Sequence, residues 1–159
     1  MSDIAAVATA ALPLIKRFEG LRLAAYPDPA SGGDPWTIGY GATGEGIGHG
    51  VTWTQDQADS DLLTRVSKLA AEVCGVVTTA LPDPSIAACV SLAYNIGFHA
   101  FAGSTVLRKI NADDYRGAAD AFGMWNKAAG RVFIGLVKRR TEEMQAFLAG
   151  IDIDTTGAA

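Results

Sequence analysis

The chain has 159 residues, of which 49% are hydrophobic, so it is long enough to form one globular domain with a substantial core. Its formal net charge of −4 argues against a strong nucleic-acid binder, because such proteins neutralise phosphates with clustered lysines and arginines. The same charge gives no long-range attraction to an anionic polymer, so any electrostatic help with such a substrate must be local.

Residues 3–19 are predicted to form the first helix, which ends at Gly20. Pro13 leaves two alternatives, a helix with a kink at the proline or a helix that begins near residue 12. In either case Glu19 is the last helical residue. The C-terminal end of a helix carries partial negative charge, which disfavours an ionised carboxylate and suits a general acid, although a nearby arginine would oppose this effect.

Residues 21–50 are rich in glycine and are predicted to form a small β-sheet. The segment WTIGYG at 36–41 alternates like a strand, with large side chains on one face. The opposite face carries Thr37, Gly39 and Gly41. We therefore expect this face to be bare except for Thr37, so that a ligand can approach the strand closely.

Asp28 lies between Pro27 and Pro29, which restrict the backbone and favour a fixed position for the carboxylate. A fixed carboxylate can hold a water molecule for attack, whereas the alternative role for Asp28 is simple turn formation. Asp34, in the loop that follows, is the second candidate for the water-holding role.

The remainder of the chain is predicted to be helical. A capping box at Thr54–Gln57 opens a long helix that ends near residue 74 or 75. Asp83 is expected to cap a helix that extends to residue 96 and is apolar nearly all round, which is typical of a buried helix. Further helices are predicted over 104–110, 113–125 and 131–149, with a loop over 126–130.

The sequence gives little support for a catalytic cysteine or for a metal site. Cys74 and Cys89 fall within helical patterns and are either small buried side chains or a disulfide, a choice that geometry must decide. The two histidines, His49 and His99, lack the paired spacing of metal ligands, so no metal site is predicted.

Three motifs in the first 41 residues together resemble the active-site segment of the phage-type lysozymes (endolysins, glycoside hydrolase family 24). They are Glu19-Gly20, Tyr26-Pro27-Asp28 and WTIGYG at 36–41. The later segments SLAYNIG at 91–97, STVLRKIN at 104–111 and GLVKRRTEE at 135–143 extend the resemblance to nearly the whole chain. It implies a single α+β, lysozyme-like domain over 1–159, mainly helical. A small glycine-rich β lobe at about 20–52 would be joined to a larger helical lobe by the long helix.

The resemblance also implies the chemistry. The expected activity is that of a muramidase, which hydrolyses the β-1,4 bond between N-acetylmuramic acid and N-acetylglucosamine in peptidoglycan without a metal or organic cofactor. Glu19 would protonate the leaving oxygen, while Asp28 and Thr37 would hold the attacking water, and the family precedent is inversion. The expected substrate contacts are Tyr26, Gly39 and Asn95. The alternatives are a lytic transglycosylase, and a non-catalytic glycan-binding phage protein with the same fold.

The protein is expected to act on peptidoglycan as a monomer. No nucleic-acid partner is expected. Lys138, Arg139 and Arg140 are candidates for contacts with glycan-linked carboxylates or phosphates, and the alternative is a solvated helix face paired with Glu142 or Glu143. The apolar run over 4–15 is shorter than the roughly 20 residues that span a bilayer, and no basic region precedes it. We therefore expect no stable membrane insertion, residence in the host cytoplasm until a separate pore (a holin) opens, and action on periplasmic peptidoglycan.

Overall fold

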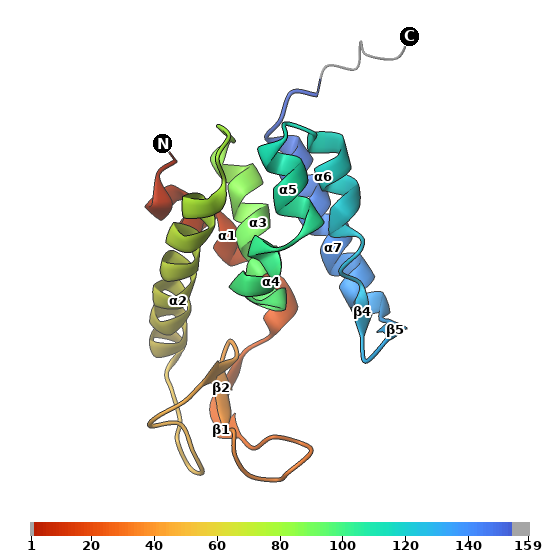
Figure 1. The fold of residues 1–159 in the computed structure, drawn as a ribbon. Helices are drawn as coiled ribbons and strands as arrows, with labels where there is room; N and C mark the ends of the chain where they lie inside the picture. Colours follow the sequence, from red (N-terminus) through yellow and green to blue (C-terminus); the bar gives the residue numbers. More distant parts are fainter. Residues whose placement is uncertain (1, 154–159) are drawn as a thin grey trace.

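A computed structural model describes residues 2–153 of the chain. Within this range the chain forms seven α-helices, a three-stranded antiparallel sheet and a two-stranded hairpin (Figure 1). The predicted α+β class, mainly helical with a small sheet, is therefore confirmed. Residue 1 and residues 154–159 of the predicted domain lie outside the described range.

Helix α1 (Ile4–Glu19) begins at Asp3, whose side chain accepts a hydrogen bond of 3.0 Å from the backbone of Ala5. Pro13 lies inside the helix, so the alternative start near residue 12 is wrong. The helix stops at Glu19 because Gly20 adopts a φ of 69°, which side-chain-bearing residues rarely accept. One face of the helix is buried, and its residues are Val7, Ala8, Ala11 and Ile15.

The three-stranded sheet consists of β1 (Arg22–Tyr26), β2 (Thr37–Gly39) and β3 (Ala42–Thr43), in that order. Thr37 lies opposite Tyr26 on one side and Thr43 on the other, so it occupies the central strand. The small predicted sheet is confirmed, with its strands confined to residues 22–43.

The expectation of a bare sheet face is wrong at Gly39. Gly39 is buried, and a Cβ atom added there would lie 2.9 Å from the ring of Trp53. The backbone φ of Gly39 is 63°, so the local chain departs from a regular strand. Glycine is needed here because the indole ring of Trp53 packs directly on the backbone, and Trp53 lies outside the segment whose alternation suggested an open face.

Helix α2 (Gln55–Val76) opens with the predicted capping box, in which Thr54 and Gln57 each accept a hydrogen bond from the other's backbone. It contacts β2 as well as α1 and α3, and so connects the sheet to the helical part as expected. Helix α3 (Asp83–Ile96) is buried along most of its length and packs against α1, α2 and α7. Pro82, without a side-chain cap, precedes it; Asp83 is its first residue, so the predicted cap is wrong by one position.

The chain after α3 contains two features that the sequence did not predict. Helix α4 (Phe98–Ala102) follows α3 directly and precedes α5 (Thr105–Asn111) and α6 (Tyr115–Phe122). A hairpin of β4 (Lys127–Ala128) and β5 (Arg131–Val132) replaces the predicted loop, and α7 (Ile134–Ala149) therefore starts three residues later than expected. The hairpin and the three-stranded sheet project from the same end of the helical part (Figure 1).

Cys74 and Cys89 are both free thiols. Cys89 is fully buried in the core and Cys74 is half-buried. Burial raises the pKa of both thiols, which keeps them protonated and unreactive at neutral pH. No helix within residues 2–153 combines the length and the apolar character needed to cross a membrane.

Candidate active site

The Glu19 carboxylate lies where α1, α7 and the sheet meet. Its Oε1 accepts a 2.6 Å hydrogen bond from Nη1 of Arg139 on α7, and its side chain is 23% exposed. On the other side, a Cβ atom added to Gly41 would lie 3.9 Å from Glu19 Oε2. The carboxylate is thus held by a guanidinium, lies close to the turn between β2 and β3, and keeps access to solvent.

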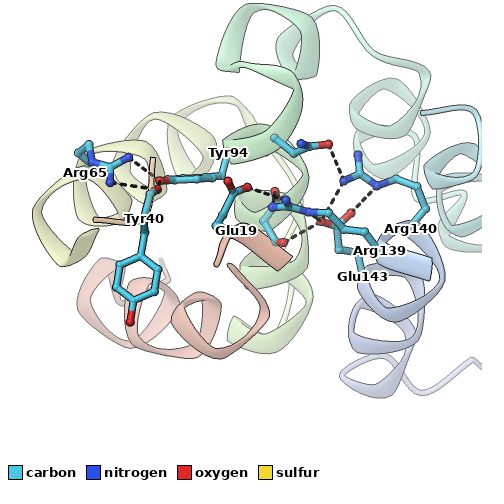
Figure 2. A network of polar contacts seen from close by, with 9 residues as sticks. Glu19, Tyr40, Arg65, Tyr94, Arg139, Arg140 and Glu143 are labelled. Carbon is cyan, nitrogen blue, oxygen red and sulfur yellow. Dashed lines mark hydrogen bonds and ion pairs between the residues drawn. The ribbon is translucent and has the colours of Figure 1, made fainter. Parts of the chain in front are cut away.

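Arg139 is itself held by a buried network on α3 and α7 (Figure 2). Its Nε donates to Oε1 of Glu143 at 3.0 Å, and its Nη2 donates to the backbone oxygen of Ser91 at 3.2 Å. The hydroxyl of Ser91 also donates to Glu143 Oε1 at 2.7 Å. Arg139 is 4% exposed and Glu143 fully buried, so the guanidinium that meets Glu19 has little freedom to move.

Arg140 completes the network from the opposite side of Glu143. Its Nε lies 2.9 Å from Glu143 Oε2, and its Nη2 donates to Asn95 Oδ1 at 2.9 Å. The two arginines and the carboxylates of Glu19 and Glu143 carry balanced charge, which a buried cluster requires. Burial lowers the pKa of Arg140 to about 10, and burial raises the pKa of Glu143 against the opposing effect of both guanidiniums and of Ser91.

A second set of hydrogen bonds fixes the turn beside Glu19. The Tyr94 hydroxyl donates to the backbone oxygen of Tyr40 at 2.7 Å, and Arg65 donates to the Tyr94 hydroxyl (Figure 2). Burial raises the pKa of Tyr94, so its hydroxyl stays a donor at neutral pH. Helices α2 and α3 therefore jointly position the Tyr40–Gly41 backbone next to the Glu19 carboxylate.

Asp28 lies in the loop between β1 and β2, which is held by hydrogen bonds between residues close together in the sequence. Its backbone N–H donates to Gly33 at 3.0 Å, its backbone oxygen accepts from Gly32 at 2.8 Å, and its Oδ2 accepts from the Ser31 backbone at 3.1 Å. Asp34 is exposed, and only its backbone oxygen takes part in this loop, as an acceptor from Ser31. Asp28 is therefore the more firmly placed of the two carboxylates.

The other predicted site residues lie in different surroundings. Thr37 is half-buried on the central strand, and Tyr26 is half-buried opposite it beneath the guanidinium of Arg22, whose Cζ lies 4.7 Å from the ring centroid. Asn95 is exposed at the end of α3 and holds Arg140 through its side-chain oxygen. Gly39 lies under Trp53, so it is the member of the predicted set that the fold removes from solvent.

Of the two alternatives for Arg139 and Arg140, contact with glycan-linked carboxylates or phosphates is wrong, because both side chains are buried and face glutamates of this chain. Both arginines pair with Glu143, as the other alternative expected, but on a buried face of the helix and not on a solvated one. Lys138 remains exposed. The sequence did carry a signal for this network, since Glu143 follows Arg139 by four residues and Arg140 by three, the spacings at which helical side chains meet.

Chemically, the site offers one carboxyl group at a helix end and a second on a separate loop. Glycoside hydrolysis commonly uses two carboxyl groups from different elements. One protonates the leaving oxygen, and the other either activates an attacking water or attacks the sugar carbon itself.

Comparison with known proteins places the chain in a family. The model described as phage lysozyme matches residues 16–143, a range that contains both carboxylates and the arginine–glutamate network. The endolysin of Acyrthosiphon pisum secondary endosymbiont phage 1 is 40% identical over 140 residues, which are 86% of this chain and 93% of that protein.

Two further similar proteins are an endolysin and a muramidase domain. The endolysin of Bacillus phage B103 is 36% identical over 144 residues, or 91% of this chain but 54% of that protein, so this chain spans about half of its length. The solved muramidase domain of SpmX from Asticaccaulis excentricus is 36% identical with a TM-score of 0.78, over 87% of this chain and 95% of that one. The chain belongs to the phage lysozyme family.

Proposed function

We propose that this protein is an endolysin with muramidase activity, which hydrolyses the β-1,4 bond between N-acetylmuramic acid and N-acetylglucosamine in bacterial peptidoglycan. The observation that carries the proposal is the Glu19 carboxyl group, which is partly exposed, held at 2.6 Å by Arg139 and backed by the fixed turn at Gly41. The muramidase domain and the endolysins to which the chain is similar support the same chemistry.

In this mechanism Glu19 acts as the general acid and protonates the glycosidic oxygen as the bond breaks. Asp28 and Thr37 hold the water that attacks the opposite face of the sugar ring. Hydrogen bonds that close the loop around Asp28 support this role, because a carboxylate in a fixed position can orient a water molecule. The sugar inverts at its anomeric carbon if a water attacks directly, and retains its configuration if the carboxylate attacks first.

The soluble fragments released from peptidoglycan, weighed by mass spectrometry, test the function. The wild-type protein is expected to release fragments with reducing muramic-acid ends, because water adds across the cleaved bond. Fragments with anhydro ends would instead show transglycosylation, in which the sugar's own hydroxyl takes the place of water. A complete lack of soluble fragments would contradict both activities.

The same assay assigns the water-holding carboxylate. Asp28→Asn is expected to lower kcat by about two orders of magnitude, since an amide keeps the shape of the side chain but accepts protons and orients water poorly. Asp34→Asn, on an exposed side chain of the same loop, is the matched control and is expected to stay within about twofold of wild type. Full activity in Asp28→Asn with a loss in Asp34→Asn would transfer the role to Asp34.

Peptidoglycan cleavage by such an enzyme leads to lysis of the host cell. We further propose that the protein acts as a monomer and waits in the host cytoplasm until a separate holin opens the membrane and gives access to the periplasm. Expression in a bacterial host is then expected to leave the culture turbid until a pore is co-expressed. Rapid clearing of the culture without any pore would contradict this dependence, and sedimentation equilibrium measures the oligomeric state.

A further inference from the structure

The turn between β2 and β3 is held by donors from two helices. The Tyr94 hydroxyl donates to the backbone oxygen of Tyr40 at 2.7 Å, and Nη2 of Arg65 donates to the same oxygen at 3.4 Å. Gly41, the next residue in this turn, lies beside the Glu19 carboxylate, since a Cβ atom added to it would be 3.9 Å from Glu19 Oε2. The backbone oxygen that receives both donors is therefore one residue away from the contact with the carboxylate.

The direction of these hydrogen bonds follows from the chemistry of Arg65. A guanidinium can only donate, so the Tyr94 hydroxyl must accept from Arg65 and use its own proton for Tyr40 (Figure 2). Asp61, one turn earlier on α2, accepts from Nε of Arg65 at 2.9 Å and lies 2.8 Å from Nη2, which fixes the guanidinium. We call this chain of hydrogen bonds, from Asp61 through Arg65 and Tyr94 to the backbone oxygen of Tyr40, the tether.

Tyr40 is also held at the end of its side chain. Its phenol donates to Asp59 at 3.2 Å and accepts from Gln55 at 3.2 Å, both on α2. Lys16, in the last turn of α1, pairs with Asp59 at 3.1 Å. The side chain and the backbone oxygen of Tyr40 are thus both anchored, and one anchor belongs to the helix that carries Glu19.

The two oxygens of the Glu19 carboxyl group have different surroundings. Oε1 accepts a 2.6 Å hydrogen bond from Arg139, whose guanidinium cannot accept one in return. A proton on this carboxyl group therefore belongs on Oε2, the oxygen that faces the turn at Gly41. The position of the turn consequently determines where the proton is presented and how a glycosidic oxygen can approach it.

We propose that Tyr94 and Arg65 are positioning residues for the general acid, an inference that rests on the proposed muramidase function. The tether holds the turn at Gly41 against Oε2 of Glu19, so that the proton passes from Oε2 to the glycosidic oxygen as that oxygen's bond to the anomeric carbon breaks. Arg139 stays on Oε1 and balances the charge that remains on the carboxylate. In this role neither Tyr94 nor Arg65 contacts the substrate.

The test removes one hydroxyl from the tether. Tyr94→Phe keeps the ring and leaves the Tyr40 oxygen with only the longer bond from Arg65. It is expected to lower kcat on peptidoglycan about tenfold with KM within about twofold, because a small misplacement of a reacting group slows the reaction without weakening substrate binding. Tyr115→Phe, which removes a hydroxyl bound to Asp113 at the start of α6, is the matched control and is expected to keep wild-type kcat.

A double-mutant cycle separates positioning of the acid from a general loss of structure. If Tyr94 acts through the Glu19 proton, adding Tyr94→Phe to Glu19→Gln is expected to lower the residual kcat by less than about twofold, because the amide has no acidic proton left to place. An equal tenfold loss in both backgrounds would show that the hydroxyl acts independently of the acid and would overturn the proposal. Arg65→Lys, which keeps the charge beside Asp61 but loses the planar fork, is expected to lower kcat about threefold with KM unchanged.

The outcomes for the positioning role and for the proposed function can be told apart. If the wild type releases soluble fragments and Tyr94→Phe releases them at the same rate, only the positioning role fails. If the wild type releases none, the muramidase function fails, and the backbone amide signal of Gly41 in NMR spectra then tests the tether itself. A shift of this signal in Tyr94→Phe but not in Tyr115→Phe supports the tether, and an unchanged signal contradicts it.

Discussion

Glutamine in place of Glu143 is expected to lower the free energy of unfolding by about 3–5 kcal/mol, the usual cost of removing one partner from a buried ion pair. The carboxylate is fully buried and lies between Arg139 and Arg140, at 3.0 and 2.9 Å. Without its charge, the two guanidiniums are left with Glu19 as their one remaining anion in the network. Neither guanidinium can lose its proton at neutral pH, so the imbalance must be carried by the folded state.

Urea denaturation followed by circular dichroism measures this change, and Glu142→Gln is the control. Glu142 neighbours Glu143 on α7, but its partner Arg17 has a side chain that is 67% exposed, so the pair is screened by water. The control is expected to lose at most about 1 kcal/mol. If both variants lose the same small amount, the buried network does not hold α7 against α3 as its geometry indicates.

Features set by residues close together in the chain could be predicted from the sequence. The stop of α1 at Gly20 depends on one backbone conformation, and the start of α2 depends on Thr54 and Gln57, three residues apart. The buried character of α3 follows from its own composition. These are local preferences, and the packing of the protein agrees with them.

Features set by contacts across the chain could not be predicted in this way. Trp53 covers Gly39 from outside the strand, which alternation within the strand does not show. The β4–β5 hairpin depends on Ala129 and Gly130, whose φ values of 49° and 75° turn the chain back on itself, and alanine is a poor signal for such a turn. Because alanine gives no signal for this turn, the helical pattern predicts that α7 begins at residue 131, three residues before its observed start at Ile134.

The candidate site shows the same division. The resemblance singled out Glu19, Asp28 and Thr37, but the partner that holds Glu19 lies 120 positions away in the sequence. The spacing of Arg139, Arg140 and Glu143 on α7 is a local signal of ion pairing. That signal does not tell a solvated helix face from a buried network, because the difference depends on Ser91 and Asn95 of α3, which the folded chain brings beside α7.

Glutamine in place of Glu19 is expected to lower kcat on peptidoglycan by about two to four orders of magnitude, the range that general acid catalysis contributes. The amide has nearly the shape of the carboxyl group and its oxygen can still accept the hydrogen bond from Arg139, so the end of α1 keeps its position. What it lacks is a proton that it can give to the leaving oxygen. Binding of insoluble peptidoglycan, measured by co-sedimentation, is therefore expected to be unchanged while the release of soluble fragments falls.

The matched control is Glu72→Gln, which removes the same charge from an exposed position on α2. It is expected to retain wild-type kcat, because it contacts no part of the site and a single exposed charge has little effect at a distance in salt. Activity of Glu19→Gln within a few-fold of wild type would remove Glu19 from the mechanism. Loss of both binding and cleavage, with a lowered unfolding midpoint, would instead mean that the carboxylate acts mainly as the anionic partner of Arg139.

The Glu19 side chain is 23% exposed, whereas Glu143 in the same network is fully buried. Because of this difference in exposure, we expect the two substitutions to have different effects: the change at Glu143 lowers stability, and the change at Glu19 lowers the rate of the reaction.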